Sequence, residues 1–151
     1  MRQGEYRYSI DVICPADSAA ALFADIPRLA SVHPLVIGTR ELPAAPDALH
    51  SYAVTDRLAL GPLRFHLTYR ADLLEADDRH ISTRARQSPS TTLLSRVHIT
   101  DAGDGITHID VTVTVTTLSL LFAYTLRTAK AAHLRMAHGA KRLLEADAAA
   151  M

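Results

Sequence analysis

One acidic residue, Asp56, occupies a position where the pattern of the sequence calls for an apolar side chain. Val54 and Leu58 flank it at a spacing of two, and alternate residues of a strand share one face. Removing a carboxyl group from water favours its neutral form, which suits a general acid or base. Asp56 is therefore the first candidate for proton transfer. The alternatives are a bulge that returns it to solvent and an arginine partner.

Tyrosines share this apolar face. Tyr52 and Tyr69 fall on the same side as Asp56, where a ring can pack and a hydroxyl can hold a ligand carbonyl. Leu67 is expected directly opposite Asp56, with Tyr69 diagonal to it. A core tyrosine bonded to the backbone is the competing interpretation. Two more polar residues at apolar positions, on later strands, are Gln87 and Ser95.

Another set of candidates lies on the apolar stripe of a long C-terminal helix. Thr125 and Thr128 can bond a ligand or the preceding helical turn. Ala132 leaves space beside them, and Met136 is a ligand contact or core filler. We expect this stripe to face the sheet.

The eight histidines form no recognisable metal-binding pattern. His98 and His108 are expected to be cross-strand neighbours, but they share the polar face and no third ligand is evident, so we expect solvated side chains. The sequence contains no His-Glu-x-x-His, no phosphate-binding glycine loop and no Gly-x-Ser-x-Gly. Cys14 is alone, which excludes an intrachain disulfide and a thiolate metal cluster. We expect no metal and no cofactor.

Composition excludes several classes of protein. The 151 residues, 48% hydrophobic and 21% charged, suit a single domain over residues 1–151. Sixteen basic and sixteen acidic side chains give a net charge of zero, which argues against nucleic-acid binding and polybasic membrane attachment. The longest uncharged run, 111–126, is shorter than the ~18–20 residues that span a bilayer, and the N-terminus lacks an apolar signal segment. We expect a cytoplasmic monomer or homodimer without stable membrane insertion.

Hydrophobic periodicity predicts the elements that position these residues. A period of two predicts strands at 5–14, 35–42, 49–60, 63–75, 79–87, 91–100 and 105–117. Helical signals predict short helices at 16–26 and 27–31 and a long helix at 118–148.

The turns between strands set the register. The two-residue loop Gly61-Pro62 should pair Leu60 with Leu63, and Ser88-Pro89-Ser90 is another turn. A turn over 101–105 would place His98 opposite His108 and Arg96 opposite Asp110.

Several segments carry a family resemblance. They are Tyr8-x-Ile10-x-Val12, the run from Pro15 to Asp25, His33-Pro34-Leu35-Val36, and the terminal run 118–144. In this order they resemble the START/Bet v 1-like (SRPBCC) superfamily, which includes polyketide cyclase/dehydrase and lipid transport proteins. The resemblance implies an α+β helix-grip fold: a seven-stranded curved antiparallel sheet wrapped around a long C-terminal helix, with two short helices after the first strand.

The resemblance also implies a ligand site, an apolar cavity between sheet and helix. His33 would lie near its opening, as a gate or acid–base group; the alternative is a capping or surface histidine. We expect binding of a small hydrophobic or aromatic ligand, polyketide- or lipid-like. One alternative is a polyketide cyclase/dehydratase in which Asp56 moves a proton and Tyr69 holds a carbonyl or enolate oxygen. The other is a protein-interaction module with a filled interior. Because this scaffold hosts unrelated activities, no catalytic residue is carried over.

Overall fold

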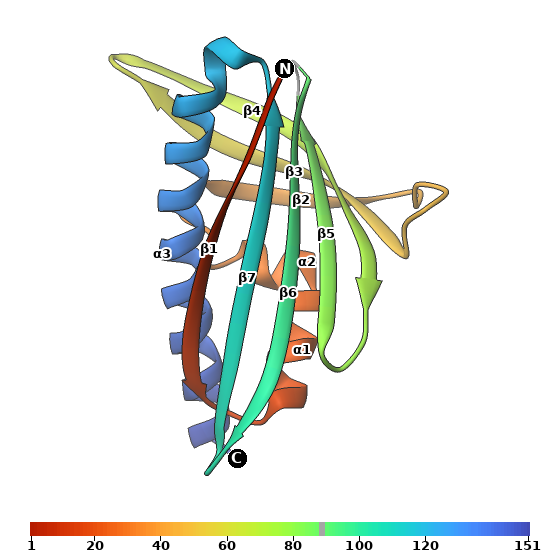
Figure 1. Cartoon of the computed structure of the whole chain (residues 1–151), viewed down its shortest axis with the longest axis vertical. Helices are drawn as coiled ribbons and strands as arrows, with labels where there is room; N and C mark the ends of the chain where they lie inside the picture. Colours follow the sequence, from red (N-terminus) through yellow and green to blue (C-terminus); the bar gives the residue numbers. More distant parts are fainter. Residues whose placement is uncertain (88–89) are drawn as a thin grey trace.

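One curved antiparallel sheet forms the body of the protein, with strand order β1-β7-β6-β5-β4-β3-β2. The computed structural model describes residues 1–87 and 90–151, with Leu60 described by its backbone. The strands β1, β6 and β7 run along the long axis, whereas β2, β3 and β4 cross it (Figure 1). The bounds are β1 Arg2–Ile13, β2 Val36–Leu42, β3 His50–Leu60, β4 Leu63–Ala76, β5 His80–Gln87, β6 Thr91–Gly103 and β7 Ile106–Thr117.

Two short helices follow the first strand, as expected. They are α1, Ala16–Ala24, and α2, Ile26–Ala30. The first helix ends two residues earlier than its pattern predicts, because Asp25 leaves the helical conformation. Its side chain accepts the backbone N–H of Arg28 and so caps the N-terminus of α2.

The long helix α3, Phe122–Ala149, is preceded by a single 3₁₀ turn, η1, Ser119–Leu121. Its buried residues lie mainly in its second half and face the sheet and the short helices: Ala132, Met136, Ala137, Gly139, Ala140 and Leu144. At its start, the ring of Phe122 packs over Gly4 of β1. Among the described residues, no helix has the length and apolar character needed to cross a lipid bilayer.

Gly139 allows α3 to approach the turn that follows α2. A Cβ atom at this position would lie 2.9 Å from Cβ of Val32 and 3.2 Å from its carbonyl oxygen. In a helix interior, replacing glycine by alanine normally stabilises by about 1 kcal/mol. Here the clash reverses that sign, and we expect Gly139→Ala to lower the free energy of unfolding by about 1–3 kcal/mol. Urea denaturation measures this, with His138→Ala on the exposed side of the same turn as control; a Gly139→Ala protein as stable as the control would contradict the close contact.

The β3–β4 register is confirmed, since Leu60 pairs with Leu63 and Asp56 with Leu67. The turn expected at Ser88 and Pro89 lies outside the described residues.

The β6–β7 register expected from the sequence is wrong by two residues. His98 pairs with Asp110 instead of His108, and Arg96 pairs with Thr112. The reason is a shorter turn: Asp104 and Gly105 both have positive φ, as a two-residue hairpin loop requires, and a bulge follows Asp101. Because the shift is even, the apolar residues stay on the core face.

Candidate functional site

A pocket of about 230 Å³ lies between the inner face of the sheet and α3. Its wall combines strands from across the sheet with α2, the turn after α2, and the first half of α3. Most of the lining is apolar, and the small side chains of Ala129 and Ala132 leave room on the helix side. A cavity with few polar groups in an apolar wall is the usual form of a small-molecule site.

Most of the candidates from the sequence lie in this wall. Those in the lining are His33, Asp56, Tyr69, Gln87, Ser95, Thr125, Thr128, Ala132 and Met136. Tyr52 and Leu67 are not among the lining residues, although both keep the expected strand parity. The ring of Tyr52 lies beside that of His50, with 6.4 Å between centroids. Both residues are at the start of β3, before the part of the strand that lines the pocket.

Asp56 is a buried carboxylate in the pocket wall, with 7% of its surface exposed. Its neighbours across the sheet are Val36 on β2 and Leu67 on β4, so it lies inside the sheet and not at an edge. Within the described part of the chain, its Oδ1 atom has no hydrogen-bond partner. Burial raises the pKa of Asp56 to about 6, an effect that the hydroxyl of Tyr69 partly offsets.

Tyr69 is the phenol next to this carboxylate. Burial raises its pKa, and the charge of Asp56 raises it further, so the hydroxyl keeps its proton at neutral pH. Tyr69 can therefore donate a hydrogen bond while Asp56 accepts or gives up a proton near neutral pH.

Two histidines form a second polar group in the wall. Nδ1 of His33 accepts the backbone N–H of Leu35 at 3.1 Å, and the rings of His33 and His133 meet edge to face, with 5.9 Å between centroids. Nδ1 of His133 lies 2.6 Å from the hydroxyl of Tyr6. The pKa of both histidines is lowered to about 4, by burial in each case and, for His133, also by the nearby His33. Both rings are neutral at pH 7.

Sequence reasoning missed His133 as a pocket residue. The other histidine of this helix, His138, lies five positions away on a different helix face, so the two histidines do not form a recognisable pair. The informative spacing was to Ala129 and Met136, four residues before and three after, which share its face.

Comparison with known proteins identifies the architecture. No family model matches the chain, and no curated protein matches it. Among solved structures, the Zhui aromatase/cyclase from Streptomyces sp. R1128 is similar at a TM-score of 0.64 and 16% identity, covering 97% of this chain and 94% of that one. A START superfamily protein from Mycobacterium smegmatis is similar at 0.68 and 15%, covering 93% and 97%. The protein has the SRPBCC-type helix-grip fold.

A di-domain protein of known structure contains a similar fold within a longer chain. The aromatase/cyclase StfQ from the steffimycin biosynthetic pathway is similar at a TM-score of 0.76 and 14% identity, covering 97% of this chain and 52% of that one. Sequence identities this low establish the helix-grip fold alone.

On the opposite face of the helix-grip sheet, Asp72 is the centre of an ionic network. It is completely buried, and it accepts hydrogen bonds from Ser51 at 2.6 Å and from Arg70, Arg84 and Arg86 at 2.8–3.1 Å. Burial alone would raise its pKa, but the hydrogen bonds outweigh burial and hold the pKa at about 2. The β2–β3 loop covers this network: Arg70 donates to the carbonyl of Pro43, and Asp47 binds Arg84 through both carboxylate oxygens.

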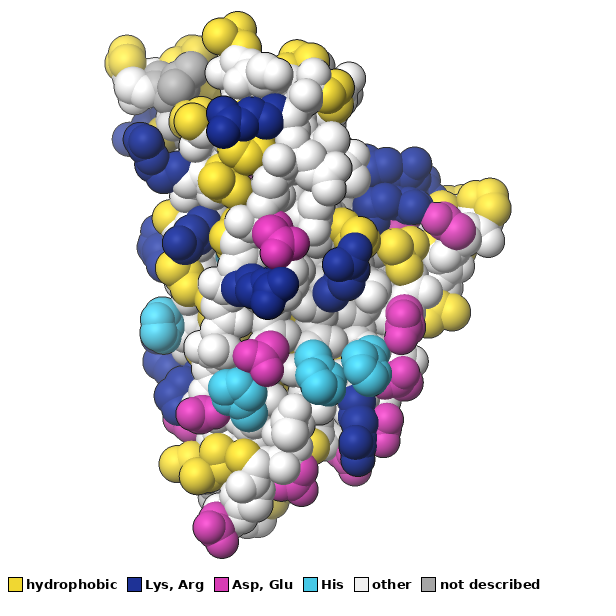
Figure 2. Space-filling view, viewed as in Figure 1, with side chains coloured by type: hydrophobic (Ala, Val, Ile, Leu, Met, Phe, Trp, Pro, Cys, Tyr) yellow, Lys and Arg dark blue, Asp and Glu magenta, His cyan; other side chains and the backbone are white. Residues whose placement is uncertain are grey.

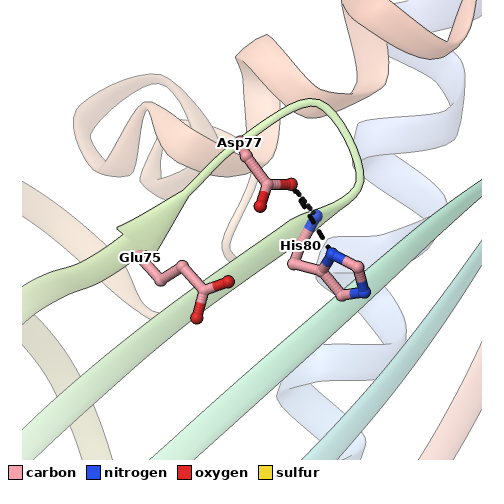
Figure 3. Close-up of side chains that lie close together, drawn as sticks. All are labelled: Glu75, Asp77 and His80. Carbon is pink, nitrogen blue, oxygen red and sulfur yellow. Dashed lines mark hydrogen bonds and ion pairs between the residues drawn. The ribbon is translucent and has the colours of Figure 1, made fainter.

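A polar cluster at the β4–β5 turn has the donor types of a metal site. The side chains of Glu75, Asp77 and His80 bring ligand atoms within 4.8 Å of one another, all exposed (Figure 3). The Asp77 carboxylate already accepts the backbone N–H groups of Arg79 and His80 at 2.8 and 2.7 Å. This is the hydrogen bonding of a turn, and it carries no argument for a metal.

His98 is exposed on the outer face of the sheet, as expected for a solvated side chain. Its ring stacks on that of His80, with 4.9 Å between centroids. Figure 2 shows histidine and acidic side chains together across this face. His108 bonds to Asp11 and Asp110, at 2.5 and 3.1 Å.

Proposed function

We propose that the protein binds a small hydrophobic or aromatic molecule, polyketide- or lipid-like, in the pocket between the sheet and α3. The observation that carries this proposal is the unfilled space of about 230 Å³ beside Ala129 and Ala132. This volume lies below the ~300–1,000 Å³ typical of ligand pockets, which favours a compact ring system. Two structural neighbours are named as aromatase/cyclases, and their presence agrees with such a ligand.

Filling the pocket is the direct test. Ala132→Leu places a larger side chain in the pocket wall, and we expect it to weaken binding of the neutral fluorescent probe 1-aminoanthracene at least tenfold. Fluorescence titration measures the dissociation constant. Ala131→Leu is the matched control, because residue 131 is exposed on the same helix, and it should change the constant less than twofold. Equal effects of the two variants, or no binding to the unmodified protein, would contradict the proposal.

The second candidate function is acid–base catalysis of the polyketide cyclase/dehydratase type. A specific observation favours it: a buried carboxyl group with a pKa of about 6 beside a phenol, in a wall that also holds His33. In this candidate Asp56 moves the proton and Tyr69 holds the carbonyl or enolate oxygen. Asp56→Asn would then leave ligand affinity roughly intact and abolish turnover; unchanged turnover would remove the assignment.

An interaction module is less well supported. It requires a helix packed flush against the sheet, and the space beside Ala129 and Ala132 counts against that arrangement.

A further inference from the structure

The pocket contains an acceptor that none of the described residues uses. Oδ1 of Asp56 is buried in the wall, and none of the described residues donates a hydrogen bond to it. Buried polar atoms are almost always paired, because an unpaired one loses its bonds to water without replacement. In the wall of a ligand pocket, such an unpaired acceptor is available to a donor group of a bound molecule.

Two other titratable groups of the wall, His33 and Tyr69, are neutral. Because Nδ1 of His33 accepts the N–H of Leu35, the proton of its neutral ring is on Nε2, which makes that atom a donor. The hydroxyl of Tyr69 also keeps its proton. Neither group supplies a positive charge at pH 7.

Among the described residues, the lining offers no available cation. In that part of the chain, Arg84 is the one lysine or arginine that lines the pocket. Its guanidinium group is bound by Asp47 and Asp72, through both carboxylate oxygens of Asp47. An anionic ligand would therefore meet the Asp56 carboxylate with no counter-charge, in a site where burial strengthens repulsion.

We propose that Asp56 determines specificity: the pocket selects uncharged ligands that carry a hydroxyl group, which donates to Oδ1 of Asp56, and rejects carboxylates of similar size. This inference rests on the proposed function, because it names the chemical class of ligand for the same pocket. It separates hydroxylated ring compounds from free fatty or aromatic acids, which an apolar cavity alone would not separate.

Three naphthalene derivatives of similar size test the selection. At pH 7.5, 2-naphthol is uncharged and has a donor, 2-methylnaphthalene has no donor, and 2-naphthoate is anionic. Their dissociation constants follow from displacement of 1-aminoanthracene, titrated separately for each variant. We expect the unmodified protein to bind 2-naphthol at least tenfold more tightly than 2-naphthoate.

Two substitutions separate the acceptor from the charge. Asp56→Leu removes both. We expect the preference for 2-naphthol over 2-methylnaphthalene, measured as the ratio of their dissociation constants, to fall at least tenfold in this variant. Asp56→Asn keeps an oxygen acceptor without charge. Its affinity for 2-naphthol should therefore stay within about threefold of that of the unmodified protein, and its affinity for 2-naphthoate should rise at least tenfold. If Asp56→Leu does not fold, Asp56→Asn alone still tests the charge.

The outcomes distinguish this inference from the proposed function. The selection by Asp56 is overturned if all three compounds displace 1-aminoanthracene with equal affinity, or if the 2-naphthoate dissociation constant is unchanged in Asp56→Asn. Either result leaves an unselective apolar pocket. Absence of binding by 1-aminoanthracene and by all three compounds overturns the proposed function itself.

Discussion

Asp56→Asn is expected to raise the free energy of unfolding at pH 7.5 by about 1–3 kcal/mol. The carboxyl group has a pKa of about 6 in the folded protein, against 3.8 for an ordinary aspartate. Each pKa unit corresponds to about 1.4 kcal/mol. A raised pKa means that the folded state binds the proton more tightly than the unfolded state, so the unmodified protein loses stability as the pH rises from about 4 to about 6. Asparagine has nearly the same shape and no charge, so the stability of the Asp56→Asn protein does not fall in this pH range.

Urea denaturation at pH 4 and pH 7.5 measures the difference. The gain from Asp56→Asn should be present at pH 7.5 and nearly absent at pH 4, where the native carboxyl group is protonated. Asp78→Asn, at an exposed position of the β4–β5 turn, is the control and should show no comparable pH-dependent gain. Equal or lower stability of Asp56→Asn at pH 7.5 would show that the carboxylate is compensated within the fold, and with it the argument for a ligand donor would fail.

Asp72→Ala is expected to act in the opposite direction and to lower the free energy of unfolding by about 3–5 kcal/mol. The substitution leaves Arg70, Arg84 and Arg86 gathered around a site without their shared carboxylate. It also removes the acceptor of the buried Ser51 hydroxyl, which in turn accepts the N–H of Ala45 and anchors the β2–β3 loop. Removing one partner of a buried ionic network costs far more than the network's net contribution, because the remaining charges stay partly desolvated.

Asp47→Asn is the matched control for this network. Asp47 binds the same guanidinium group of Arg84 from the exposed side, where water screens the ion pair, so Asp47→Asn should cost much less stability than Asp72→Ala. Chemical denaturation at pH 7 compares the variants. Because the pKa of Asp72 is about 2, its contribution should stay constant down to about pH 4 and disappear only on further acidification. A loss below 1 kcal/mol for Asp72→Ala would mean that the arginines are solvated without it.

Sequence patterns predicted the position of Asp56 because two independent signals agreed. Strand alternation assigned it to the apolar face, and the Gly61-Pro62 loop set a register that the structure reproduces. The same logic failed at the β6–β7 hairpin, where Asp101–Gly105 contains enough turn-forming residues for either a two-residue or a three-residue loop. Alternation preserved the faces there, but the paired residues changed.

Tertiary contacts decided the features that sequence patterns missed. Asp72 alternates with the buried Ala71 and Leu73, which predicts a solvent-facing side chain; its burial depends on a loop that returns over the outer face. His133 is polar and lies on a helix with an interrupted apolar stripe. Its place in the pocket depends on Tyr6 and His33, which are distant in sequence.

The buried residues of α3 are unevenly distributed, and this has a consequence for the diversification of the pocket. After Phe122, no residue from 123 to 131 is buried, whereas Ala132–Leu144 contains the close contact at Gly139 and most of the helix core. The first half of the helix still contributes Thr125, Thr128 and Ala129 to the pocket wall. Substitutions there can change the shape and polarity of the binding site at little cost in folding energy. A mutant library restricted to these positions would retain the scaffold while sampling different ligands.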